Sequence, residues 1–181
     1  MRVGIADHFG WAVAVTADDD HRVVDRRRIE LVEPGVATAP VHHEGIGLDD
    51  AAAAALIDEV RASAARATAA SLDELAAEVG GPIEAIALRV VPDGFPTELE
   101  VLRRSPWEAR ADAVMYREVL ADAAAARGWS VLRYLAKDVE ADAARVLGDR
   151  ADDVLRGPRA RLGAPWAKDH RVALAATIVG A

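Results

Sequence analysis

The chain has 181 residues, of which 52% are hydrophobic and 29% are charged, a composition typical of a globular protein. It contains no cysteine, which excludes disulfides, thiolate metal sites and cysteine nucleophiles. A formal net charge of −8 disfavours strong non-specific binding to nucleic acid. The length fits one domain spanning residues 1–181. Because no charged segment followed by an apolar stretch begins the chain, we expect a soluble cytoplasmic protein without a membrane partner.

The first sixteen residues predict a β-hairpin. Residues 3–6 and 11–16 are apolar and β-forming, and the segment between them holds Asp7 and Gly10. An acidic residue at this place is either a functional group at the rim of a sheet or a turn residue that bonds its own backbone. Residues 22–32 predict a third strand, so the three strands should form an antiparallel meander.

The middle of the chain predicts a loop, helix and strand. The loop at residues 34–47 contains His42, His43 and Glu44, which could bind a metal or form a mobile lid, although a solvated polar loop is the simpler interpretation. Helical periodicity over residues 49–79 predicts one helix, or two if Ser71 caps a second. Residues 83–91 are almost continuously apolar, which is typical of a strand buried on both faces.

The remaining segments predict two further helices, a strand and a last helix. Ser105 and Pro106 favour the start of a helix that runs to Gly128. Its large apolar residues are best explained as core, with a homodimer face as the alternative: Trp107, Met115, Tyr116 and Val119. A strand follows at 129–136, a short helix at 138–147, a loop at 157–163 and a helix from 165 to 179. This order predicts an α/β fold with a mixed five-stranded sheet, antiparallel on one side and parallel on the other, with helices on both faces.

This order of elements resembles the ribonuclease H-like superfamily, and within it the RuvC and YqgF type of Holliday junction resolvase. Residues 3–7, Val-Gly-Ile-Ala-Asp, are similar to the family's first strand with its leading aspartate. Residues 169–175, Asp-His-Arg-Val-Ala-Leu-Ala, are similar to its final helix. The resemblance implies metal-dependent hydrolysis of phosphodiesters in structured nucleic acid, with Asp7 and Asp169 as catalytic carboxylates that hold Mg²⁺ or Mn²⁺.

The chain departs from the family pattern at two positions. Val172 stands where the final helix of the family carries a second aspartate, and Arg89 stands near the end of the fourth strand, where an acid is expected. If Arg89 points inward, it places positive charge where a metal would sit. Asp93 in the following loop is the remaining candidate for a third catalytic carboxylate. The alternative hypothesis is therefore a non-catalytic binding or assembly module that has lost its metal ligands.

A histidine follows each of the two matched aspartates. If His8 and His170 converge with Asp7 and Asp169, the four side chains suit Mn²⁺ or Zn²⁺ better than Mg²⁺. Because consecutive residues point in different directions, only one residue of each pair is expected to face inward.

Basic residues gather near the C-terminus, where they could contact phosphate groups: Arg159, Arg161, Lys168 and Arg171. Acidic residues are interspersed among them, including Asp152 and Asp153. A solvated surface whose charges pair with one another is the alternative interpretation.

Overall fold

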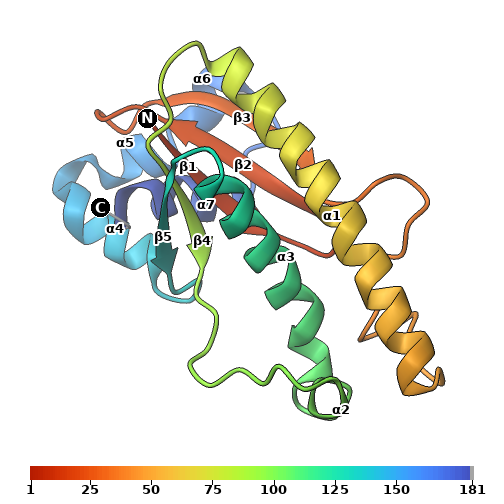
Figure 1. Ribbon diagram of the computed structural model, residues 1–181. Coiled ribbons are helices and arrows are strands. Elements are labelled where there is room, and N and C mark those ends of the chain that lie inside the picture. Colours follow the sequence, from red (N-terminus) through yellow and green to blue (C-terminus); the bar gives the residue numbers. More distant parts are fainter. Residues whose placement is uncertain (180–181) are drawn as a thin grey trace.

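The computed structural model describes residues 1–179 and contains a five-stranded sheet in the order β3-β2-β1-β4-β5 (Figure 1). The central strand β1 is antiparallel to β2 and parallel to β4, while β4 is parallel to β5 and β2 antiparallel to β3. The strands are β1 (Arg2–Asp7), β2 (Trp11–Ala17), β3 (Val23–Glu30), β4 (Ala85–Arg89) and β5 (Ser130–Tyr134). The predicted mixed sheet, with its antiparallel meander, is confirmed.

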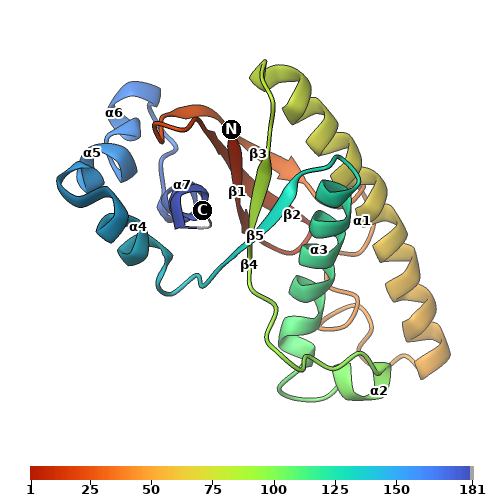
Figure 2. The same cartoon turned by 60° about the vertical axis from the view of Figure 1, so that its left-hand side comes forward.

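Helices cover both faces of this sheet, as predicted (Figure 2). One face carries the long helices α1 (Asp50–Val79) and α3 (Glu108–Ala125), and the short α2 (Leu99–Leu102) precedes α3. The other face carries α4 (Val139–Leu147), α5 (Ala151–Leu155), α6 (Pro158–Leu162) and α7 (Lys168–Val179). None of the helices within residues 1–179 combines the length and the apolar character needed to cross a membrane.

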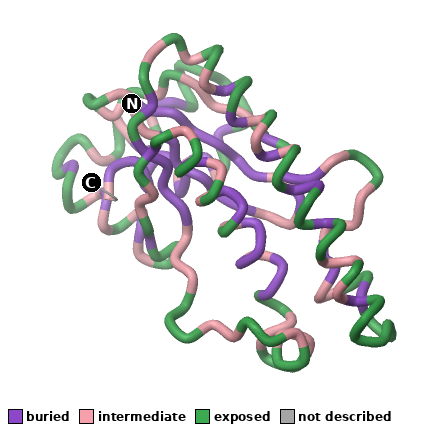
Figure 3. The backbone as a smooth tube through the Cα atoms, in the orientation of Figure 1, coloured by how far each residue is buried: buried purple, intermediate pink, exposed green. Residues whose placement is uncertain are grey.

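Alternation along the strands divides the apolar side chains between two cores. Val3 and Ile5 of β1 pack with residues of α1 and α3, whereas Ala6 packs with residues of α4 and α7. Figure 3 shows the buried residues concentrated in the sheet and on the helix faces that cover it. Because successive side chains of a strand point to opposite faces, the odd-numbered residues of β1 face one core and the even-numbered residues face the other.

Helix α7 lies directly against the middle of β1. A β-carbon added at Gly4 would lie 1.8 Å from the carbonyl oxygen of Ala173 and 2.7 Å from its carbonyl carbon. Only glycine permits this approach of strand to helix, because any side chain would collide with helix backbone. The close contact sets the position of the start of α7, which carries Asp169.

Several element boundaries differ from the sequence predictions. Residues 50–79 form one helix capped by Asp49, because Ser71 donates its hydroxyl to the carbonyl of Glu30 and does not cap a second helix. The predicted helix start at Ser105 and Pro106 is wrong: these residues lie in a turn between α2 and α3, and α3 begins at Glu108. Part of the predicted loop at 157–163 is α6, and the last helix begins three residues later than predicted.

Substitution of Gly4 by alanine should lower the free energy of unfolding by about 3 kcal/mol or more, because the backbone of Ala173 cannot move aside. Gly81→Ala is the matched control. Its added methyl would meet only the flexible end of Met1, at 2.9 Å, and should cost less than about 1 kcal/mol. Urea unfolding of both variants measures the difference. Equal stabilities would contradict this account of the α7 contact.

Candidate functional site

Asp7, the last residue of β1, lies in a buried ion-pair cluster at the end of the sheet. Its side chain is 3% exposed. The Nε of Arg117 donates to its Oδ2 at 2.9 Å, and the Nε of Arg89 lies 3.4 Å from its Oδ1. The Asp7 carboxylate is therefore held between two guanidinium groups.

Three different elements bring these charges together. Asp7 follows Ile5 in strand alternation, so it faces the side of the sheet covered by α3, from which Arg117 reaches it. Arg89 ends β4, the parallel neighbour of β1, and alternates with Leu88, which packs with the α1 and α3 core. Arg89 accordingly approaches the carboxylate from the side of the sheet opposite to Arg117.

The electrostatics of the cluster follow from burial and from this pairing. Burial lowers the pKa of Arg89, but the charge of Asp7, with Tyr134 and Asp169, more than offsets it, so the pKa lies above its ordinary value. Burial raises the pKa of Tyr134 to about 12 although Arg89 opposes the shift. The Tyr134 hydroxyl donates to the carbonyl of Ile5 at 2.6 Å, which ties the end of β5 to β1. Both the arginine and the tyrosine therefore keep their protons at neutral pH.

His8 and Asp169 form a second pair beside the cluster. The Nε2 of His8 lies 3.1 Å from the Oδ2 of Asp169, and both side chains are about one-third exposed, at 37% and 35%. The His8 ring stacks on Trp11 with centroids 4.1 Å apart, and the guanidinium of Arg28 lies 4.2 Å from the centroid of the same tryptophan. The sequence-predicted approach of the first strand to the last helix is thus made by His8 with Asp169.

His170 does not join this pair. Its Nδ1 accepts from the backbone N–H of Ala167 at 3.3 Å, and its ring packs against Trp166. Burial, and after it the charge of Arg26, lowers the pKa of His170, while Asp169 acts in the opposite direction. His170 lines a hollow of about 480 Å³ that it shares with Trp11, Arg26 and Asp169. As expected for consecutive helical residues, the two neighbours point in different directions.

The acids near the strand ends do not make up the donor set of a divalent metal pair. Asp7 is paired with two arginines and Asp169 with His8. Asp93 is exposed in the loop after β4. Across the described part of the chain, no three side chains of histidine, aspartate or glutamate cluster as a metal site. The residues present therefore do not fit the Mg²⁺ or Mn²⁺ centre that the family resemblance implies.

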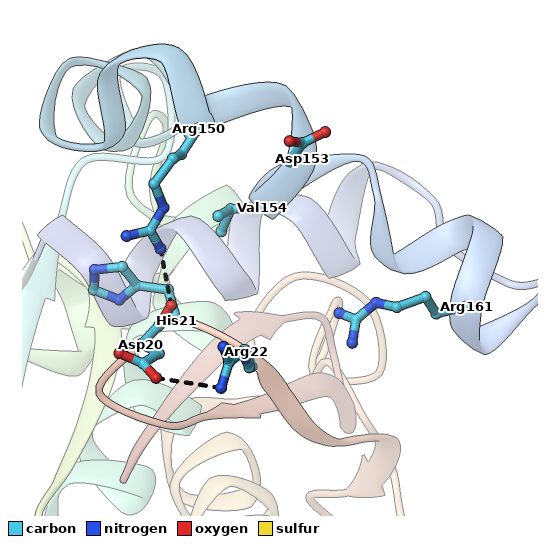
Figure 4. Close-up of a pocket in the computed structure, with 7 residues that line it drawn as sticks. All are labelled: Asp20, His21, Arg22, Arg150, Asp153, Val154 and Arg161. Atoms are coloured by element: carbon cyan, nitrogen blue, oxygen red, sulfur yellow. Dashed lines mark hydrogen bonds and ion pairs between the residues drawn. The ribbon is translucent and has the colours of Figure 1, made fainter.

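The four predicted phosphate-binding residues have different surroundings. Arg171 is paired with Glu140 of α4 at 3.1 Å, and Arg159 and Lys168 are exposed. Arg161 lines a hollow of about 360 Å³ with Arg22 and Arg150 (Figure 4). This hollow borders the turn after β2, at the opposite end of the sheet from Asp7, because residue 17 pairs with residue 2 of β1. Two acids also line it, Asp20 and Asp153, and Asp20 is paired with Arg22 at 3.3 Å.

The loop at residues 34–47 is fastened to α3. The fully buried carboxylate of Asp112 accepts from the backbone N–H groups of Val41 and His42, at 2.9 and 3.0 Å. Glu44 accepts from the backbone of Thr38 and Ala39 within the loop. These bonds account for Glu44 and for the backbone of His42, whereas the ring Nδ1 of His42 is buried without a hydrogen-bond partner within residues 1–179.

Arg117 and Tyr134 are the two site residues that the sequence analysis missed. A signal for Arg117 is present: it lies three residues after Val114 and three before Leu120, both of which are buried. A charged residue on the apolar side of a helix requires a buried partner. The identity of that partner, Asp7, depends on the packing of α3 on the sheet and cannot be derived from the helix alone.

Comparison of the chain with protein-family models and with curated proteins finds no match.

Substitution of Tyr134 by phenylalanine should lower the free energy of unfolding by about 1–2 kcal/mol at neutral pH, because it removes the hydrogen bond to Ile5. The folded pKa lies above the unfolded value of 10, so the folded state holds the proton more tightly, and the stability due to this hydroxyl should be lost as pH rises from 10 to about 12. Urea unfolding at neutral pH and within this window measures both effects.

Tyr116→Phe is the control, because burial raises the pKa of Tyr116 further still and its hydroxyl donates to Thr38 in the fastened loop. Because an unfolded tyrosine titrates near 10 in both cases, the Tyr116→Phe deficit should narrow over the same window, and it should go on narrowing above pH 12, where that of Tyr134→Phe levels off. A Tyr134→Phe deficit that does not change with pH would show that this hydroxyl is not what stabilises the strand end.

Proposed function

We propose that this chain is a ribonuclease H-like domain of the RuvC and YqgF type in which an internal ion-pair cluster has replaced the metal centre. In this proposal the domain is a non-catalytic binding module and not a nuclease. Its cytoplasmic location and the homodimer face expected from the sequence stay predictions.

The observation that carries the proposal is the pairing of Asp7 with Arg117 and Arg89. A divalent cation about 4 Å from a guanidinium would be repelled by roughly 8 kcal/mol at an effective dielectric constant of about 20. Two arginines would double this repulsion. The attraction of the cation to the single Asp7 carboxylate would cancel the repulsion from only about one arginine. The balance of charge at the end of β1 therefore opposes a cation.

The arrangement of the elements supports the ribonuclease H-like part of the proposal. β1 is the central strand, it joins the antiparallel to the parallel half of the sheet, and its last residue is an aspartate. The final helix packs on β1 and brings Asp169 to His8, next to that aspartate in the chain. In α/β sheets, sites form outside the strand ends at such a reversal of strand order.

A metal-dependent nuclease is the competing function, and a cleavage assay separates the two. The intact chain, incubated with branched DNA, single-stranded DNA and RNA in Mg²⁺ or Mn²⁺, should produce no cleavage, and calorimetric titration with Mn²⁺ should give no binding heat. Asp169→Asn is the appropriate variant, because it removes the charge that pairs with His8, a pair whose side chains are about one-third exposed, and should leave the fold intact. Cleavage by the wild type that Asp169→Asn abolishes would overturn the proposal.

A further inference from the structure

Guanidinium groups outnumber carboxylates at the end of the sheet that holds Asp7. Arg89, Arg117 and Arg133 come from β4, α3 and β5, and Asp7 is the one carboxylate that forms ion pairs with any of them within residues 1–179. Arg89 and Arg117 share the Asp7 carboxylate, and the side chains of Arg133 and Arg117 reach the neighbouring backbone carbonyls of Arg89 and Val90, at 3.5 and 3.4 Å. Burial, followed by repulsion from Arg117, lowers the pKa of Arg133. The cluster thus carries uncompensated positive charge.

A hollow of about 280 Å³ lies next to this cluster. Its lining includes Val90 and Pro92 at the end of β4 and one side of α3, on which Arg110 and Arg117 lie seven residues, or two helical turns, apart. Arg110 is exposed, and no ion pair or side-chain hydrogen bond of Arg110 occurs within the part of the chain that the structure describes. Among the described residues 1–179, no acidic side chain lines this hollow. It therefore combines apolar walls with two guanidinium groups.

The hollow at the opposite end of the sheet is lined by acidic as well as basic side chains. Three arginines line the hollow of Figure 4, but Asp20 and Asp153 line it too, and Asp20 already pairs with Arg22. Its side chains are also strongly exposed, at 70% for Arg22 and 72% for Asp20. The hollow beside Arg117 is the better place for an anion, because no acidic side chain among residues 1–179 lines it and Arg117 is largely buried, at 13% exposure.

The cluster also leaves hydrogen-bonding capacity unused. Arg117 uses its Nε and Nη1 for Asp7 and Val90, and no bond from its Nη2 is made within residues 1–179. The guanidinium of Arg110 and the Nη2 of Arg117 therefore remain as donors at the hollow, and phosphate oxygens accept paired bonds from arginine.

We propose that the hollow lined by Arg110 and Arg117 binds a phosphate group, with Arg133 adding positive charge beside Arg117. The site at the strand ends then attracts an anion where the family resemblance implies a divalent cation. This inference rests on the proposed function as a binding module and names its ligand chemistry. The phosphate can belong to a free nucleotide or to a nucleic-acid strand. The net charge of −8 makes local recognition of one or two phosphates more favourable than contact along a duplex.

Binding is tested on the full chain by calorimetry and by the shift in thermal unfolding with three probes: inorganic phosphate, adenosine monophosphate and a short single-stranded DNA, all with a chelator present to remove metals. The proposal expects binding of at least inorganic phosphate or the nucleotide, weakening with added salt. A strand that binds more tightly than the nucleotide identifies nucleic acid as the source of the phosphate, and a nucleotide that binds while the strand does not identifies a small ligand.

Arg110→Gln and Arg133→Gln are the diagnostic variants, because neither arginine pairs with a carboxylate within residues 1–179 and neither removal leaves Asp7 unpaired. Each should weaken binding of the probe about tenfold, the value of one charge-assisted hydrogen bond. Arg161→Gln, at the opposite end of the sheet, is the matched control and should change binding less than about twofold.

Absence of binding by all three probes would overturn the phosphate site while leaving the non-catalytic proposal intact. Binding that Arg161→Gln weakens and Arg110→Gln does not would also overturn it, by placing the anion at the other end of the sheet. Cleavage of nucleic acid in the separate metal-dependent assay would instead overturn the proposed function.

Discussion

The ion pairs of Asp7 are the interaction on which the rest of this structure depends. One carboxylate at the end of the central strand joins α3, through Arg117, to the neighbouring strand β4, through Arg89. A buried carboxylate without partners would be costly, so the three residues must be kept together. The same pairing determines the chemistry of the strand end, because a carboxylate occupied by two arginines has little remaining attraction for a metal.

The fold places this cluster where α/β proteins usually bind ligands. β1 joins the antiparallel and parallel halves of the sheet, and α7 packs so closely on it that Gly4 is required at the contact. The location of a site is thus a property of the topology, whereas its charge is a property of a few side chains. Arg89 at the end of β4 and Arg117 on α3 reverse the sign of charge at this location relative to a carboxylate-rich metal centre.

Much of the fold could be predicted from local patterns, and the limits have physical reasons. Apolar runs and turn residues located all five strands, and Asp7 was placed correctly at the end of the first. The predicted start of α3 at Ser105 and Pro106 is wrong, because a serine–proline pair is as compatible with a turn as with a helix cap. The sequence predicts that the first strand and the last helix approach each other, which His8 and Asp169 do. It does not predict the arginine partners of Asp7. Arg117 reaches Asp7 across 110 positions of the chain, and only the packing of α3 on the sheet creates that contact.

The sign of the stability change in Asp7→Asn tests the central claim most directly. If Asp7 is a structural partner of two arginines, the substitution leaves them without their carboxylate, and the free energy of unfolding in urea should fall by about 2–4 kcal/mol at neutral pH. In a metal centre, carboxylates repel one another when no metal is bound, so neutralising one of them should stabilise the protein. A variant as stable as the wild type or more stable, together with stabilisation of the wild type by Mn²⁺, would contradict the account.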